Sequence, residues 1–164
     1  MLFNIAKMSH AQLCTGIIGE PSVVIDFGAN LPVSYALRQV PPPYKFTRLD
    51  CPNQGFYSVT NSTFQCFNNL WQVLPFDHTA NDISGEFLLF NALPGPTNIF
   101  EDTIRGLCGG HAFQVSAWIC NIVNARVCDD ASSIPNLTFS IYSLQGILLA
   151  TYTSGKIVTN SPAR

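Results

Sequence analysis

Charged residues are scarce in this chain of 164 residues, making up 11% of it against the roughly 25% typical of a soluble domain. Lysine and arginine form no cluster and the formal net charge is -2, so the basic surface that nucleic-acid binding requires is missing. No run of about 18 apolar residues occurs either, which argues against a transmembrane helix. These absences exclude nucleic acid as a partner and a membrane span, and the polar, uncharged surface that remains suits an exported protein.

Motifs of catalysis and of zinc binding are also lacking. The chain has no G-x-S-x-G, no H-E-x-x-H and no glycine-rich phosphate loop, so we do not expect an enzyme. Its six cysteines contain no C-x-x-C pair, and an even, dispersed set is typical of disulfides formed in an oxidising compartment. The short loops they would close favour Cys51–Cys66 and Cys120–Cys128, and elimination leaves Cys14 with Cys108.

What the chain does contain is short apolar runs and alternating segments separated by Gly, Pro and Asn turns, with no convincing helical period. We predict about seven strands and an all-β, antiparallel β-sandwich. The 87–90 run is continuously apolar and predicts a central strand, and the last hairpin is expected to stop at Thr153. Residues 1–12 are either the remnant of an export signal or an unstructured start. The predicted strands lie at 21–27, 55–60, 87–90, 98–104, 113–121, 136–142 and 147–153, with an edge strand near 44–47.

Several motifs resemble a domain of large secreted surface proteins of Bacteroidota, including adhesin-like and gliding-associated proteins; they lie at 14–16, 19–28, 77–79, 106–108, 113–121 and 135–139. The resemblance implies a domain over residues 13–155, a tail at 156–164, and similarity to jelly-roll carbohydrate-binding modules. Domains of this kind continue with an aromatic strand and an Asp-rich last strand. Because neither is present here, we expect an exposed sheet edge, reduced stability and self-association.

The segment 113–121 holds the main candidate for a ligand site. Its alternation predicts that Phe113, Val115 and Ile119 face the core while Gln114, Ser116 and Trp118 face outward. If 136–142 is the neighbouring strand, Thr138, Ser140 and Tyr142 extend the same face. An aromatic ring flanked by amides and hydroxyls matches a sugar. The alternative is that the loop at 121–134 covers Trp118.

The polar loop 71–82 holds the second candidate. It contributes Trp71 and His78 as ligand-binding candidates, and Asp77 and Asp82 as oxygen ligands for calcium. Glu20 joins them because the jelly-roll modules that the chain resembles often hold a calcium ion beside the first strand. The alternative is that the two aspartates form turn hydrogen bonds and His78 packs the loop.

We therefore expect a non-catalytic secreted or cell-surface module that binds a polysaccharide or a cell-surface glycan, with calcium as the one candidate cofactor. The competing expectation is a structural adhesin or stalk domain that only positions neighbouring domains of a larger protein and has no small-molecule ligand.

Overall fold

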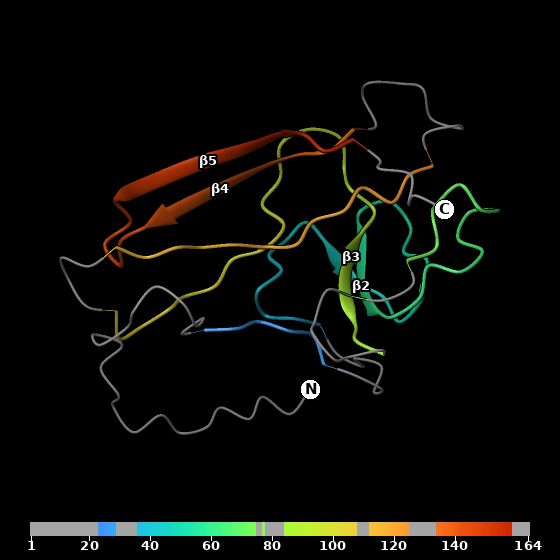
Figure 1. Ribbon diagram of the computed structural model, residues 1–164, viewed down its shortest axis with the longest axis horizontal. Coiled ribbons are helices and arrows are strands. Elements are labelled where there is room, and N and C mark those ends of the chain that lie inside the picture. Colours follow the sequence, from blue (N-terminus) through green and yellow to red (C-terminus); the bar gives the residue numbers. More distant parts are fainter. Residues whose placement is uncertain are drawn as a thin grey trace. The chain divides into compact units, whose positions relative to one another are not determined.

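The computed structural model describes residues 23–28, 36–74, 77, 84–107, 112–124 and 134–158. These residues form strands and no helix, which confirms the all-β prediction. The chain divides into two compact units, one made of Met1–Thr63 with Leu74–Ser116 and the other of Phe64–Val73 with Ala117–Arg164. Each unit contains one sheet (Figure 1).

The first unit holds a three-stranded sheet with the order β1-β2-β3. The strands are β1 (Lys45–Phe46), β2 (Phe56–Thr60) and β3 (Phe87–Phe90), with β1 parallel and β3 antiparallel to β2. All three strands fall where the sequence predicts them. The prediction that 87–90 is the central strand is wrong for the described residues, where β2 lies between the other two. Only Leu89 of β3 is fully buried, because a strand at the side of a sheet has one neighbour fewer to cover it.

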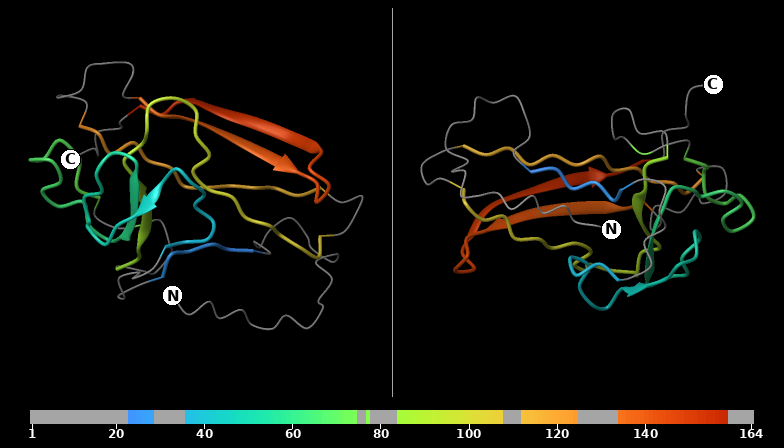
Figure 2. Two further views of the ribbon diagram at one scale, coloured as in Figure 1. Left: turned by 180° about the vertical axis from the view of Figure 1, so that it is seen from behind. Right: turned by 90° about the horizontal axis from the view of Figure 1, so that it is seen from below.

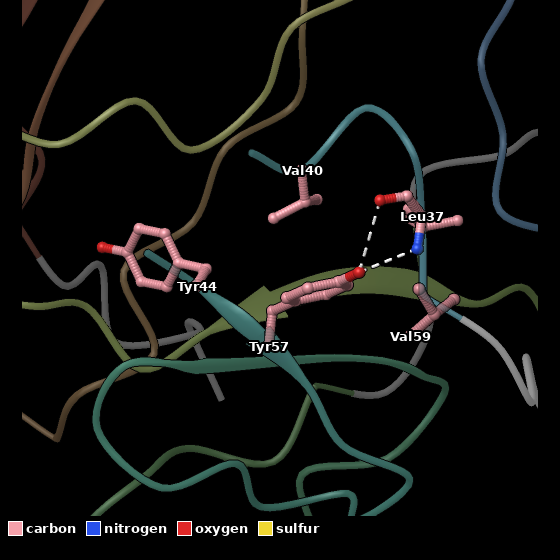
Figure 3. Packing of buried hydrophobic residues seen from close by; sticks show 5 residues of the cluster. All are labelled: Leu37, Val40, Tyr44, Tyr57 and Val59. Atoms are coloured by element: carbon pink, nitrogen blue, oxygen red, sulfur yellow. Dashed lines mark hydrogen bonds between the residues drawn. The ribbon is translucent and has the colours of Figure 1, made fainter. Parts of the chain in front are cut away.

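The core of this unit packs against one face of β2 (Figure 3). Tyr57 and Val59 point to the same face because they are two residues apart on a strand. The Tyr57 side chain is only 1% exposed, and its ring lies 5.6 Å from the rings of Phe46 and Phe90. Its hydroxyl accepts a hydrogen bond from the backbone N–H of Leu37 at 2.7 Å, so the buried polar atom is satisfied.

The opposite face of β2 is polar and is tied to the loops around it. Thr60 donates a hydrogen bond through its hydroxyl to the Asp50 carboxylate at 2.6 Å. Next to Asp50, Cys51 forms a disulfide with Cys66, which confirms the predicted pairing. The buried hydroxyl of Thr63 accepts a bond from the backbone N–H of Leu74 at 3.0 Å. The loop after β2 is therefore held by one covalent bond and several hydrogen bonds.

The second unit contains the predicted hairpin, made of β4 (Asn136–Tyr142) and β5 (Leu148–Lys156) in antiparallel pairing (Figure 2). Gly146 turns the chain at a φ of 80°, a conformation that glycine adopts without steric cost. The expectation that the hairpin stops at Thr153 is wrong, since β5 continues to Lys156 opposite Asn136. The hydroxyl of Ser154 accepts a bond from the Leu137 N–H at 3.0 Å and so carries the pairing past that point.

Three predicted strands, at 21–27, 98–104 and 113–121, are not formed over their described residues, which are 23–27, 98–104 and 113–121. The reason is that their described backbone groups make isolated hydrogen bonds rather than a ladder. Gly28 accepts one bond, from the Glu86 N–H at 2.8 Å, and Glu101 donates one, to the carbonyl of Gln39 at 2.7 Å. Alternation shows that a segment could bury one face, but a strand also requires a neighbour with which to pair.

Candidate functional site

The segment 112–120 runs without helix or strand and is exposed at every position (Figure 1, light orange). The prediction that Phe113, Val115 and Ile119 face the core is wrong, because all three side chains are largely exposed. The polar side is exposed as well. Both sides of the segment are therefore exposed to solvent. Exposure alone does not identify a binding residue, so the candidates are the side chains whose chemistry matches a ligand.

Trp118 is the most exposed large apolar residue in the described part of the chain, at 79%. This value disagrees with the alternative in which a loop covers the ring, although 125–133 of that loop lie outside the described residues. Tyr142, at the end of β4, belongs to the same compact unit and is 59% exposed. Gln114 and Ser116 are exposed too, but they fall in the other unit.

The predicted six-residue face is thus present only in parts. Thr138, Ser140 and Tyr142 alternate along β4 and are exposed, as predicted, and the Thr138 hydroxyl lies 3.3 Å from that of Thr153 on β5. Within the described residues, however, β4 pairs only with β5. The segment carrying Trp118 is not a strand of this sheet.

The segment 112–120, which carries Trp118, is fixed at its C-terminal end, where residues 121–124 pair with residues 70–72. Val123 forms an antiparallel bridge with Trp71. Two backbone hydrogen bonds of 2.7 Å flank it, from the Gln72 N–H to the Ile122 carbonyl and from the Asn124 N–H to the Leu70 carbonyl. This pairing holds the end of the segment in place.

Trp71 lies in the core, not at the surface as its candidacy for ligand binding requires. Its side chain is 9% exposed and its ring packs edge-on against Phe67, with the centroids 4.6 Å apart. Phe67 itself has a φ of 51°, a left-handed conformation that is unusual for a residue with a large side chain. A buried ring cannot stack on a soluble sugar, so we assign Trp71 to the support of the segment instead.

Asn121 is a second anchor, and sequence reasoning did not identify it. Its side chain is buried, donates from Nδ2 to the carbonyl of Ile157 at 3.1 Å, and accepts from the N–H of Val123 at 3.0 Å. A buried amide with both ends bonded fixes backbone on either side of it. Asn121 therefore ties the end of the Trp118 segment to the residues that follow β5.

The acidic candidates do not form a metal site in the described part of the chain, where no three His, Cys, Asp or Glu side chains gather. Glu20, His78 and Asp82 lie outside the described residues. Asp77 is half-buried and packs against Gly85, where an added Cβ would overlap its carboxylate. Gly85 is thus the residue that leaves room for Asp77.

Glu86 is a buried carboxyl that sequence reasoning missed. Its side chain is 4% exposed, and Oε2 has no hydrogen-bond partner among the described residues. Burial raises the pKa of this carboxyl, because desolvation disfavours the charged form. Its position directly before the apolar strand β3 was the available signal.

Of the cysteines in the other two predicted disulfides, Cys120 is the one that the structure describes. Cys120 is a free thiol, so the predicted bond between Cys120 and Cys128 is absent from this structure. Its sulfur lies 3.5 Å from the Asn121 carbonyl, and desolvation raises the pKa of the thiol. Cys14, Cys108 and Cys128 lie outside the described residues.

In the described residues, these observations define an all-β arrangement with one disulfide and an exposed, anchored tryptophan segment. The described residues contain no helix with the length and hydropathy to cross a bilayer. Comparisons with protein-family models, with curated proteins and with solved structures found no match to this chain.

Proposed function

We propose that this chain is a non-catalytic, secreted or cell-surface β-sandwich module that binds glycans, with Trp118 as the platform on which a sugar ring stacks. The exposure of Trp118 is the observation that carries the proposal. Large aromatic rings that stay in water are the exception in folded proteins, and stacking on the apolar face of a sugar is a use that requires such exposure. The resemblance of several motifs to Bacteroidota surface domains, and the jelly-roll arrangement which that resemblance implies, agree with the proposal.

The anchoring of the segment supports the same proposal. A binding residue is effective when it is held in place before the ligand arrives, since less freedom is then lost on binding. Trp118 is three residues from Asn121, whose side chain is fixed at both ends, and five from Val123, which is bridged to Trp71. The Cys51–Cys66 disulfide agrees with an oxidising compartment and hence with export.

The test is a glycan array probed with the wild-type chain and with Trp118→Ala. We expect binding to weaken at least about tenfold, which corresponds to about 1.4 kcal/mol of lost stacking. The melting temperature should stay unchanged, because an exposed side chain contributes little to stability. The matched control is Tyr152→Ala, which removes another exposed aromatic ring from β5, on the hairpin face opposite Tyr142.

Two results would contradict the proposal. If Trp118→Ala lowers stability by several kcal/mol, the ring is part of a core and the platform is wrong. If the wild-type chain binds no glycan, either with or without added calcium, the glycan-binding proposal is wrong and the structural adhesin or stalk function is favoured. In that function the exposed surfaces contact neighbouring domains rather than a sugar.

A further inference from the structure

The outer edge of β4 is the site of this inference. Within the described residues β4 pairs with β5 on one side and with nothing on the other. We propose that this edge pairs with the same edge of a second copy of the chain, forming a two-fold symmetric dimer with a continuous four-stranded sheet, β5-β4-β4-β5.

The direction of the backbone groups identifies which residues of β4 would make the new bonds. The N–H of Leu137 donates to Ser154 on β5, so it points toward the existing partner. Backbone groups alternate in direction along a strand, which turns those of Phe139 toward β5 and those of Thr138 and Ser140 toward the open edge. The open edge thus offers regularly spaced donors and acceptors.

The other edge of the hairpin is unsuitable for pairing because β5 is irregular. Between the first two pairs of the register β5 advances from Lys156 to Thr153 while β4 advances only from Asn136 to Thr138. Another extra residue of β5 follows near Leu148. Bulges of this kind bend and twist a strand and are one way in which proteins block an edge. Both extra residues are on β5, so β4 keeps the regular edge.

The sequence of β4 indicates a second copy as the partner. Residues 137–141 read Leu-Thr-Phe-Ser-Ile, which is nearly the same chemistry in both directions around Phe139. Antiparallel pairing about a two-fold axis at Phe139 places Phe139 opposite its copy, Leu137 opposite Ile141, and Thr138 opposite Ser140. Aromatic, aliphatic and hydroxyl pairs of this kind are the favourable ones across strands.

Charge and strand number agree with this partner. No charged residue occurs from 131 to 155, so two copies of the edge do not repel each other, and lysine, the usual protection of an edge, is missing from β4. A two-stranded hairpin by itself is only marginally stable, whereas a four-stranded sheet with an apolar face can be stable independently.

The test uses charges placed at the predicted cross-strand contacts. In Thr138→Lys/Ser140→Lys, each introduced lysine faces an introduced lysine of the other copy, whereas in Thr138→Lys/Ser140→Glu each faces a carboxylate. The control Thr151→Lys/Thr153→Lys puts the same charge on the β5 positions that pair with Ser140 and Thr138. Sedimentation velocity over a range of concentrations measures the dimer dissociation constant, and far-ultraviolet circular dichroism checks folding.

We expect the wild type and the Thr138→Lys/Ser140→Glu variant to dimerise. The Thr138→Lys/Ser140→Lys variant should have a dimer dissociation constant about tenfold higher or more, because like charges directly opposite each other are destabilising. The β5 control should dimerise like the wild type. A wild type that is monomeric throughout overturns the proposal, as does a β5 control that dissociates as readily as the β4 double lysine. The experiment measures self-association in the absence of a glycan, so failure here leaves the proposed function intact.

Discussion

Replacing Tyr57 by phenylalanine isolates one hydrogen bond in the core of the first unit. The substitution keeps the ring, and with it the contacts to Phe46 and Phe90 at 5.6 Å. It removes the hydroxyl that accepts the Leu37 N–H at 2.7 Å and approaches the Leu37 carbonyl at 3.5 Å. Leu37 is buried, so no water replaces the lost partner without opening the core.

The size of the effect follows from that burial. An unsatisfied buried N–H costs about 1–3 kcal/mol of unfolding free energy. At this chain length, each kcal/mol lost lowers the melting temperature by about 2–4 °C. Removing the ring as well, in Tyr57→Ala, should cost about 3–5 kcal/mol because a cavity is added. The hydrogen bond and the packing of one side chain are thus measured separately.

The pH dependence provides a second measurement on the same pair of proteins. Burial raises the pKa of Tyr57 above its ordinary 10.0, an effect that the Leu37 hydrogen bond partly offsets. Above pH 10 the unfolded chain therefore loses this proton before the folded chain does, and the wild type loses stability as the pH rises. Tyr57→Phe has no such proton, so the difference between the two proteins should narrow above pH 10.

Thermal and urea unfolding at pH 7 and at pH 10.5 test both expectations. Tyr152→Phe is the control, because Tyr152 is mostly exposed and its hydroxyl should contribute within about 0.5 kcal/mol. The reasoning is refuted if Tyr57→Phe is as stable as that control at pH 7. It is refuted also if the difference from the wild type stays constant as the pH rises.

Two further predictions concern the covalent bond and the buried acid. Cys51→Ala/Cys66→Ala should lower the free energy of unfolding by about 3 kcal/mol, because the disulfide closes a loop of about 15 residues; equal urea midpoints for variant and oxidised wild type would contradict this. Burial raises the pKa of Glu86 from its usual 4.5, so the contribution of Glu86 to stability should fall as the pH rises above about 4.5. Glu86→Gln should reduce that slope in unfolding curves taken between pH 4.5 and 7, and an unchanged slope would exclude Glu86 as its source.

The parts of the fold that the sequence predicts are those specified by local signals. The β4–β5 hairpin combines two alternating segments with a glycine in the turn, and the β2 strand is a β-branched and aromatic run after Gly55. The disulfide closing the loop after β2 is local as well. By contrast, continuous apolarity in 87–90 does not specify a position in the sheet: β3 lies at its side, and Leu89 is its one fully buried residue.

The strand predictions that are wrong depend on partners distant in the chain. Residues 113–121 alternate as regularly as β4 does, yet they form no strand, because alternation does not identify which segment will supply the ladder hydrogen bonds. The same holds for 98–104. Buried groups with one specific partner, such as the amide of Asn121, escape prediction for a similar reason, since nothing nearby in the sequence marks Ile157 as the acceptor.

The two tryptophans show how far the site itself could be predicted. From sequence both are ligand candidates, since each is a large ring in a polar neighbourhood. The structure separates them, with Trp71 9% and Trp118 79% exposed. The difference arises from pairing: Trp71 bridges to Val123 and packs on Phe67, while Trp118 lies just beyond the paired residues. The buried Trp71 ring fixes the backbone that leads to Trp118. A substitution of Trp71 should therefore weaken ligand binding at Trp118 only indirectly, by changing the position of the segment that carries it.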